Sequence, residues 1–304
     1  MRCLVTGGAG FIGSNLVDRL IDDSHEVIII DDLSTGQEKN INPKAEFEKF
    51  DISDNEDMWG KIFKDVDVVF HLAAKARVQP SIDNPIEFHN TNVNGTLNVL
   101  KACVDNNVKR FVFSSSSSVY GDVTMLPTPE YQPLNPTSPY ALQKQIGEQY
   151  CKLFSKLYGL ETVCLRYFNV YGDGMDLEST YKLAIPIFTQ QIQNNEPMTI
   201  SGDGEQRRDF IHVDDVVEAN ILAGFNSKIP IFKCDGDVFN IGNGDNRSVN
   251  QIADLLGDNK ITVESVIEPR ETLADNSKSY RVLGWKPVVT LEKWIPKWKK
   301  EMGL

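Results

Sequence analysis

The sequence predicts an α/β protein, with a doubly wound parallel sheet and a smaller C-terminal α/β lobe that takes a substrate. Three observations predict this class. Short apolar runs alternate with helical stretches through the first two thirds of the chain. These runs lack the polar alternation of a half-exposed strand, so each is expected to be buried on both faces. After about Tyr171 the rhythm stops, and loops and shorter elements follow.

The strands are predicted from runs that are rich in valine, isoleucine and phenylalanine. These runs are Arg2–Thr6, Glu26–Ile30, Val66–Leu72, Arg110–Phe113 and Thr162–Arg166. Helices are predicted between them at Ile12–Ile21, Thr91–Asp105 and Tyr140–Tyr158. Strands that alternate with helices in this way form parallel sheets covered on both faces.

Beyond Tyr171 the sequence predicts a loop at Asp173–Thr180, a loop at Ile200–Arg208, a strand at Phe210–Val213 and a helix from Asp214. A helix rich in tryptophan and lysine ends the chain. We therefore expect the chain to cross between two domains more than once. The expected domains are a cofactor-binding domain at 1–172, joined by a returning segment at about 210–242, and a substrate lobe at about 173–209 and 243–304.

Composition and charge limit the function. The 304 residues carry a net charge of −12 at pH 7, and such a field repels nucleic acid and anionic membranes. No stretch approaches the roughly 20 apolar residues that span a bilayer. The five cysteines are scattered with no Cys-x-x-Cys pair, which predicts reduced thiols in the cytoplasm. No His, Cys, Asp and Glu cluster has metal-ligand spacing, so no metal is expected.

A glycine-rich loop follows the first strand. Gly7-Gly8-Ala9-Gly10-Phe11-Ile12-Gly13 fits the Gly-x-x-Gly-x-x-Gly spacing and stands between a strand and a helix. Glycine permits the tight turn, backbone amides can approach a pyrophosphate, and the helix N-terminus favours an anion. This is the Rossmann-type arrangement for a dinucleotide. The expected contacts are Gly7, Gly10, Phe11, Ile12 and Gly13.

Acidic residues after the second strand indicate which dinucleotide binds. Asp31, followed by Asp32, lies 18 residues past Gly13, near the spacing of about 20 expected for a ribose-binding acid. A carboxylate accepts hydrogen bonds from the ribose 2′-hydroxyl and repels a 2′-phosphate, so NAD is predicted rather than NADP. Asp51 and Ile52 follow the next strand-like run, and Asp51 is expected either beside the adenine or on the surface.

Serine, tyrosine and lysine form a candidate catalytic group. The strand at Arg110–Phe113 leads into Ser114–Ser118, and Tyr140 and Lys144 stand four residues apart at the start of a helix. A free tyrosine has a pKa of about 10, which an adjacent ammonium and a bound nicotinamide cation would lower. A serine hydroxyl at the strand end can relay a substrate proton. Together these groups suit hydride transfer from a carbinol.

With these motifs in this order, the chain resembles the extended short-chain dehydrogenases/reductases. Within them it is similar to the NAD-dependent nucleotide-sugar epimerases, typified by UDP-glucose 4-epimerase. The resemblance runs from about residue 1 to residue 295. Its landmarks are Thr6–Gly13, Asp31–Leu33, His71–Ala74, Asn92–Thr96, Ser114–Gly121, Tyr140–Lys144, Leu165–Gly172, Arg208–Asp215 and Leu283–Pro287.

The resemblance implies a role for each matching residue. Ser116 is the catalytic serine, which also contacts the substrate, Tyr140 is the base, and Lys144 is its partner and a ligand of the cofactor ribose. The residues implied along the NAD are Ala73, Lys75, Asn92 and the backbone of Tyr167. Those implied at the nucleotide-sugar diphosphate are Asn169, Arg208 and Arg270. An arginine fork matches phosphate oxygens.

The same resemblance implies the reaction. Tyr140 takes the proton of the sugar 4-hydroxyl while the C4 hydride passes to NAD, and the 4-keto sugar turns over before the hydride returns. Related dehydratases carry Thr-Asp-Glu where this chain has Ser116-Ser117-Ser118, so elimination lacks its proton carriers. The expected function is a UDP-hexose 4-epimerase. The alternatives are a decarboxylase, a dehydratase, a GDP-sugar enzyme of this family, or a non-catalytic NAD-binding regulator.

Two further expectations follow from the family. Thr272 falls where epimerases strict for UDP-glucose carry a bulky tyrosine, so acetylated sugars are expected to be accepted as well. This register depends on the segment Glu268–Asp275, which is shorter than in relatives. Members of the family pair two helices per subunit, so a homodimer is expected. The apolar residues expected to recur on those helices are Leu97, Leu100, Val104, Ile146, Tyr150 and Phe154.

Overall fold

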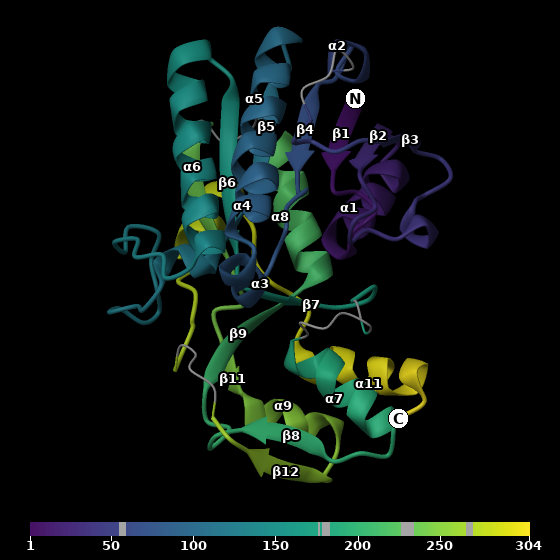
Figure 1. Ribbon diagram of the computed structural model, residues 1–304, viewed down its shortest axis with the longest axis vertical. Coiled ribbons are helices and arrows are strands. Elements are labelled where there is room, and N and C mark those ends of the chain that lie inside the picture. Colours follow the sequence, from purple (N-terminus) through teal and green to yellow (C-terminus); the bar gives the residue numbers. More distant parts are fainter. Residues whose placement is uncertain (55–58, 176, 178–182, 226–233, 266–269) are drawn as a thin grey trace.

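The computed structural model describes residues 1–54, 59–175, 177, 183–225, 234–265 and 270–304. Within them, a large lobe surrounds one sheet, and a smaller lobe below it carries short strands and helices (Figure 1). Part of the loop expected at Asp173–Thr180, and Glu268 and Pro269 of the shortened segment, lie outside the described residues.

Seven parallel strands form the main sheet, in the spatial order β10-β6-β5-β4-β1-β2-β3. They are β1 (Arg2–Thr6), β2 (Glu26–Asp31), β3 (Glu46–Lys49), β4 (Val68–His71), β5 (Arg110–Ser116), β6 (Glu161–Tyr167) and β10 (Asp235–Ile241). The doubly wound parallel sheet predicted from the sequence is therefore confirmed. The strand order reverses between β1 and β4, which is where a crevice opens beyond the carboxyl ends of the strands.

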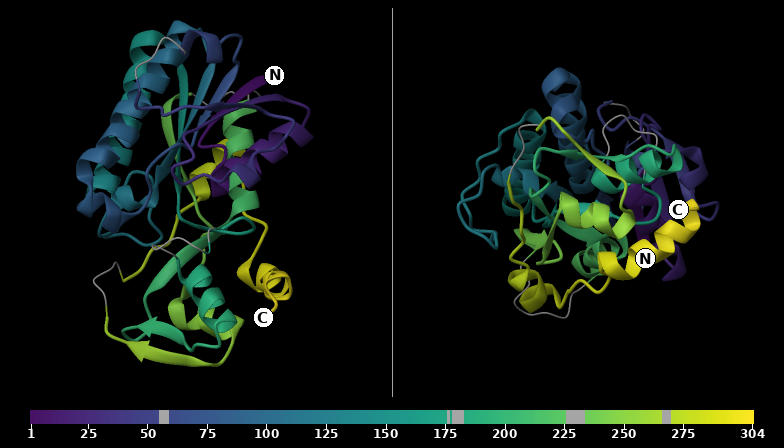
Figure 2. Two further views of the ribbon diagram at one scale, coloured as in Figure 1. Left: turned by 45° about the vertical axis from the view of Figure 1, so that its right-hand side comes forward. Right: turned by 90° about the horizontal axis from the view of Figure 1, so that it is seen from below.

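Four helices cover the sheet: α1 (Phe11–Asp22), α5 (Thr96–Asp105), α6 (Pro139–Tyr158) and α8 (Val213–Phe225). Alternate residues of β1 reach different helix layers. Cys3 and Val5 pack in one apolar core with α1 and α8, whereas Leu4 packs in another with α5 and α6. Figure 2 shows the strands edge-on between the two layers. This double burial explains why the strands lack polar alternation.

The start of α6 is fixed by local sequence. The Ser138 hydroxyl accepts a hydrogen bond from the Ala141 amide at 3.2 Å, and Pro139 occupies the first helical position. Gly159 ends the helix in the left-handed conformation, with φ of +72°. Tyr140 is therefore held in the first turn of the helix, at the carboxyl end of the sheet.

The helix predicted at Thr91–Asp105 is interrupted. After α3 (Val78–Asp83) and α4 (Pro85–His89), residues 90–95 form a turn of π-helix, and α5 begins only at Thr96. Such turns are wider than an α-helical turn and are frequent at functional sites. Here the wider turn accompanies a buried Asn92, which bonds to a loop from another part of the chain. The sequence pattern alone gave no sign of that contact.

The smaller lobe contains two sheets and three helices. One sheet has the order β11-β9-β7, and the other pairs β8 with β12. Its elements are β7 (Asn169–Tyr171), α7 (Ala184–Gln193), β8 (Met198–Ser201), β9 (Arg207–His212), β11 (Asn246–Ser248), α9 (Val249–Leu256), β12 (Lys260–Val263) and α11 (Leu291–Met302). The loop predicted at Ile200–Arg208 is shorter than expected, because both of its ends pair with strands far along the chain.

The segment between α10 (Ser277–Leu283) and α11 is hydrogen-bonded to α8 of the large lobe. After α10, the buried Trp285 donates from its indole to the Asp215 carbonyl at 2.8 Å. The Asp215 carboxylate accepts from the amides of Val288 and Val289, both at 3.0 Å. The returning segment expected at about 210–242 starts with β9 in the small lobe and ends with β10 in the main sheet. Its boundaries stay predictions.

Short elements complete the described chain. They are α2 (Trp59–Ile62) and the 3₁₀ turns η1 (Glu38–Asn40) and η3 (Ser117–Tyr120). None of the helices that the structure describes is long and apolar enough to cross a membrane.

Candidate active site

The loops after β1 and β4 meet at the crevice. The Ala73 amide donates to the Thr6 hydroxyl at 3.2 Å, and the Gly7 amide donates to the Ile30 carbonyl at 2.7 Å. A Cβ atom on Gly7 would lie 2.7 Å from the Ala73 nitrogen, and Gly7 has a φ of +73°. The structure therefore brings the predicted contacts Gly7 and Ala73 together, and only glycine fits at position 7.

The glycine loop packs closely on the N-terminus of α1. A Cβ atom on Gly13 would lie 2.0 Å from the Gly7 carbonyl oxygen, so the first turn of α1 packs directly on the loop backbone. Gly10 caps the helix without a side chain, and Phe11 and Ile12 form its half-buried first residues. Exposed amides at a helix start, approached by backbone without side chains, fit the pyrophosphate of a dinucleotide.

Asp31 is held beside this loop. Its carboxylate accepts hydrogen bonds from the Ala9 amide at 3.0 Å and the Leu33 amide at 2.9 Å. The side chain is buried, and burial raises its pKa, although the two amides oppose this. Asp32 instead accepts from the amide and hydroxyl of Ser34. Of the two acids, Asp31 therefore has the position expected of the ribose ligand.

Asp51 and Ile52 occupy the next loop, where the Phe50 amide donates to the Asp31 carbonyl at 3.2 Å. The Asp51 carboxylate accepts from the amide and hydroxyl of Ser53, both at 2.8 Å. Ile52 is buried against α5, and its carbonyl accepts from Asn98 at 3.0 Å. A role of either residue at the adenine stays a prediction.

Asn92 fixes the loop after β4. Its side-chain oxygen accepts from the Lys75 amide at 2.8 Å, and its nitrogen donates to the Lys75 carbonyl at 2.9 Å. Asn92 is 2% exposed, so its side chain acts on the loop rather than facing open solvent. The Lys75 ammonium pairs with Glu87 at 2.8 Å. Lys75 is thus paired with α4 in this structure, and its contact with NAD stays a prediction.

The predicted catalytic residues lie together where β5 ends. Ser116 lies close enough to Tyr140 to favour its ionised form, and the Ser116 hydroxyl accepts from the Ser118 hydroxyl at 2.9 Å. The Lys144 ammonium donates to the Ser114 carbonyl at 2.8 Å and lies 6.0 Å from the centre of the Tyr140 ring. The Tyr140 amide donates to the Ser81 hydroxyl of α3 at 3.1 Å, which fixes the helix start. Serine, tyrosine and lysine are thus assembled as the sequence predicted.

Burial dominates the electrostatics of this group. It raises the pKa of Tyr140, while the side chain of Ser116 and the charge of Arg77 act in the opposite direction. Burial also lowers the pKa of Lys144 to about 8. Below that pH Lys144 is a cation. A further positive charge close to the Tyr140 hydroxyl would favour the ionised form of that side chain. Burial therefore keeps Tyr140 protonated, and nearby cations favour its ionisation.

Arg77 was not singled out from the sequence. It ends the loop after β4 with a φ of +95°, which is uncommon for a residue other than glycine. Its charge acts on Tyr140, although 63 positions separate them in the sequence. An arginine near the His71–Ala74 landmark was the only available signal, and its backbone conformation could not be read from composition.

The candidate substrate residues meet along β9. Asn169 on β7 pairs with Phe210, and the backbone of Arg207 bonds to both Arg270 and Thr272. The Arg208 guanidinium donates to the Arg207 carbonyl at 2.9 Å. The Arg270 guanidinium forms an exposed pair with Asp203, at 2.8 and 3.0 Å. The substrate roles of Asn169, Arg208, Arg270 and Thr272 stay predictions.

Asp209 organises this region and was also missed. Its carboxylate is fully buried and accepts from the amides of Asn243, Gly244 and Ala274, at 2.6, 3.0 and 2.9 Å. Burial raises its pKa to about 6. The Asp209 amide donates to the Thr272 hydroxyl at 3.2 Å. Asp209 thus holds two loops beside Thr272, and its presence in the Arg208–Asp215 landmark was the only sequence signal.

The side chain of Tyr167 is buried, and the expected contact of its backbone with NAD stays a prediction. Its hydroxyl bonds to Ser114 and to Asn220 of α8, both at 3.0 Å. Among the residues that the structure describes, no three His, Cys, Asp or Glu side chains are arranged to hold a metal ion.

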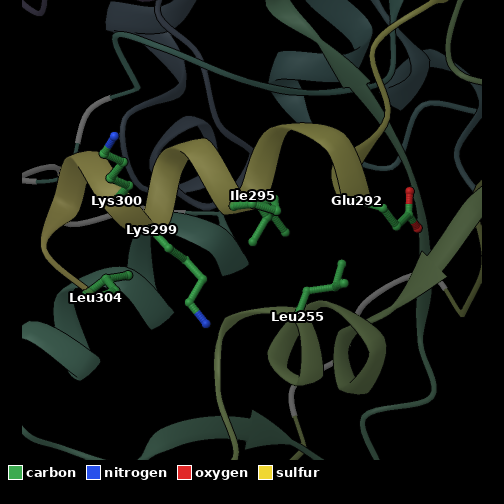
Figure 3. Close-up of a pocket in the computed structure, with 7 residues that line it drawn as sticks. Leu255, Glu292, Ile295, Lys299, Lys300 and Leu304 are labelled. Carbon is green, nitrogen blue, oxygen red and sulfur yellow. The ribbon is translucent and has the colours of Figure 1, made fainter.

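A separate cavity of about 540 Å³ lies between α11 and α9 (Figure 3). It is lined by Leu255, Glu292, Ile295, Pro296, Lys299, Lys300 and Leu304. None of these belongs to the candidate active site, and the cavity lies at the far side of the small lobe.

The chain is similar to known proteins in both sequence and structure. A model of the NAD dependent epimerase/dehydratase family matches residues 3–242. The structure is similar to that of UDP-glucose 4-epimerase from Thermotoga maritima with UDP-glucose. The TM-score is 0.91 and the identity 38%, over 99% of this chain and 100% of the other.

Two further relatives act on different sugars. A UDP-N-acetylglucosamine 4-epimerase from Methanobrevibacter ruminantium, in complex with UDP-N-acetylmuramic acid, is 38% identical with a TM-score of 0.89. That match covers 99% of this chain and 98% of the other. UDP-glucuronic acid decarboxylase 1 of Xenopus tropicalis is 33% identical over 97% of this chain and 70% of its own length.

Proposed function

Because the chain belongs to the NAD-dependent epimerase/dehydratase family, we propose that it is a UDP-hexose 4-epimerase. The observation that carries this proposal is the group of Ser116, Tyr140 and Lys144 at the end of β5, beside the glycine loop. Serines at 117 and 118 leave no carboxylic acid or carboxylate there to eliminate water. Proton transfer at a sugar hydroxyl is the chemistry that remains.

NAD is the cofactor of this family, and the glycine loop and Asp31 fit it. When bound, NAD would supply the hydride acceptor, and then the hydride donor, at sugar C4. The chain supplies the proton chemistry. Tyr140 accepts the proton of the 4-hydroxyl, Ser116 hydrogen-bonds the reacting oxygen, and Lys144 holds positive charge near the phenolate. Because the hydride would return to the sugar, and the same tyrosine would return the proton, the reaction has no net redox change.

Product analysis with a panel of nucleotide sugars tests the proposal. We expect the purified protein to interconvert UDP-glucose and UDP-galactose. It should release no carbon dioxide from UDP-glucuronate and eliminate no water from GDP-sugars. Release of carbon dioxide from UDP-glucuronate would instead favour a decarboxylase, which one relative exemplifies. No turnover of any sugar, with NAD bound, would favour a regulator.

Thr272 gives a finer expectation about the sugar. Its hydroxyl accepts from the Asp209 amide, so threonine is fixed beside β9, where a tyrosine would fill more space. We therefore expect turnover of UDP-GlcNAc and UDP-GalNAc as well, as the methanogen relative suggests. Thr272→Tyr should selectively lower kcat/KM for the acetylated pair by roughly 10–200-fold. Equal loss for both pairs, or no turnover of acetylated sugars by the parent, would contradict this reading.

We also propose a homodimer that forms through α5 and α6. Leu100 and Phe154, which were expected on the shared face, are buried in the core of the subunit. Leu142, Leu153 and Leu157 of α6 are instead exposed, by 47%, 44% and 60%. Light scattering should give about twice the chain mass of 34.2 kDa. A monomer at micromolar concentration would count against pairing, and Leu153→Glu should weaken it.

A further inference from the structure

The last three residues of β5 each contact α6 or the catalytic group on it. The Ser114 carbonyl accepts from Lys144 at 2.8 Å, and the Ser116 side chain lies beside Tyr140, where it favours the ionised form. Between them, the Ser115 hydroxyl donates to the Glu148 carboxylate at 2.5 Å. Tyr140, Lys144 and Glu148 are spaced four residues apart and share one face of the helix. The strand end is thus bound to three successive turns of α6.

Glu148 is itself held rigidly. It is 5% exposed, and the Arg166 guanidinium of β6 donates to its two oxygens at 2.8 and 2.7 Å. Arg166 is also buried and lies over the Tyr120 ring, with its guanidinium carbon 4.7 Å from the ring centre. A carboxylate bound by a planar fork has little freedom to turn. Glu148 therefore offers Ser115 a fixed acceptor.

We propose that Glu148, fixed by Arg166, is a positioning residue that sets the end of β5 against α6. It does not touch the reacting atoms. It holds Ser115, and through the backbone on either side it places Ser116 beside Tyr140 and the Ser114 carbonyl beside Lys144. This inference rests on the proposed proton chemistry of Tyr140, so its test includes a measurement that needs no substrate.

The charges near these groups are few. The charge of Arg77, in the loop after β4, acts on Tyr140. Lys144 lies near the Tyr140 ring on the same helix, and Ser116 of β5 interacts with the Tyr140 side chain. Glu148 and Cys151 of α6 interact electrostatically with Lys144. The charge of Lys144 in turn acts on His71 of β4. Arg166 faces Glu148 from β6. Displacing Ser116 from Tyr140 removes a bond that favours the phenolate, so it should raise the pH at which Tyr140 ionises.

Ser115→Ala removes the bond to Glu148 without leaving a buried charge unpaired. Its matched control is Thr162→Val, which removes another buried hydroxyl bond between a strand and α6, from Thr162 to the Cys151 carbonyl at 2.9 Å. Each protein is titrated with and without the additional substitution Tyr140→Phe. The difference in tyrosinate absorbance between the two titrations reports the ionisation of Tyr140. Steady-state kinetics and melting temperature are measured on the same proteins.

We expect Ser115→Ala to raise the ionisation pH of Tyr140 by about half a unit to one unit, and to lower kcat about tenfold with KM nearly unchanged. Thr162→Val should lower the melting temperature to a similar degree, but leave both other quantities at the parent values. Equal behaviour of the two variants would overturn the proposal. If the parent turns over no sugar, the titration still decides it, so this failure is separate from that of the proposed function.

A second variant tests the ion pair. Glu148→Leu with Arg166→Met replaces both partners by apolar side chains, which folds tolerate better than an unpaired charge. Glu161→Gln is the control, because Glu161 of β6 pairs with Arg110 of β5 at 2.5 Å, at the ends of these strands away from the catalytic group. The double variant should raise the ionisation pH of Tyr140 as Ser115→Ala does, and the control should leave it unchanged. If Tyr140 ionised at the same pH in the double variant as in the parent, the role of Glu148 would be refuted.

Discussion

Tyr140→Phe should lower kcat for epimerisation by about 10²–10⁴-fold, the range typical for loss of a general base. The substitution keeps the ring on the first turn of α6 and removes only the hydroxyl that bonds to Ser116. Because the proton acceptor is lost while the packing is kept, affinity for the UDP-sugar should change little. Steady-state kinetics together with calorimetric binding of the nucleotide sugar measure the two effects separately.

Two controls sharpen this result. Ser116→Ala should be milder, because Tyr140 can still accept the proton directly. Tyr171→Phe removes another buried tyrosine hydroxyl, one that donates to the Val289 carbonyl at 3.3 Å in the small lobe, and it should leave kcat unchanged. Turnover at the parent rate in Tyr140→Phe would show that another group is the base.

Gly13→Ala should abolish the retention of NAD. The added Cβ would lie 2.0 Å from the Gly7 carbonyl oxygen and 2.8 Å from its carbon, and both atoms belong to backbone that cannot move without opening the loop. Overpacking of this kind costs about 1–3 kcal/mol, so affinity should fall by roughly tenfold or more. Nucleotide released from denatured protein should be NAD for the parent and nearly absent for the variant.

Gly60→Ala is the matched control for this substitution. A Cβ at position 60 meets nothing within 4 Å, and alanine favours the helix in which Gly60 lies. Its NAD content should equal that of the parent. If Gly13→Ala retained NAD equally well, the glycine loop would not be the phosphate site.

The sequence predicted those features that depend on neighbours along the chain. Ser138 and Pro139 determine where α6 begins, and so they place Tyr140. The glycine loop is determined by backbone crowding between residues six positions apart. Features that depend on distant contacts were missed. Asn92 turns into the loop at Lys75 through a π-helical turn, and the amides that donate to Asp209 come from loops more than 30 residues away.

The same difference applies to long side chains whose ion-pair partners the sequence did not predict. Arg270 and Lys75 were assigned by motif position, and the structure pairs them with the carboxylates of Asp203 and Glu87. A motif fixes which residue stands at a position in the chain. It does not fix which of several acids a long, flexible side chain will reach, because that depends on the shape of the loops around it.

The late arrival of β10 in the main sheet has a consequence for how the chain is made. β10 spans Asp235–Ile241 and covers the edge of β6, and α8 covers the same face as α1. A nascent chain that has left the ribosome only as far as residue 172 therefore has an open strand edge and an uncovered apolar face. Open edges of this kind invite pairing with other chains. The first 172 residues should consequently depend on chaperones, or aggregate, when produced as a fragment.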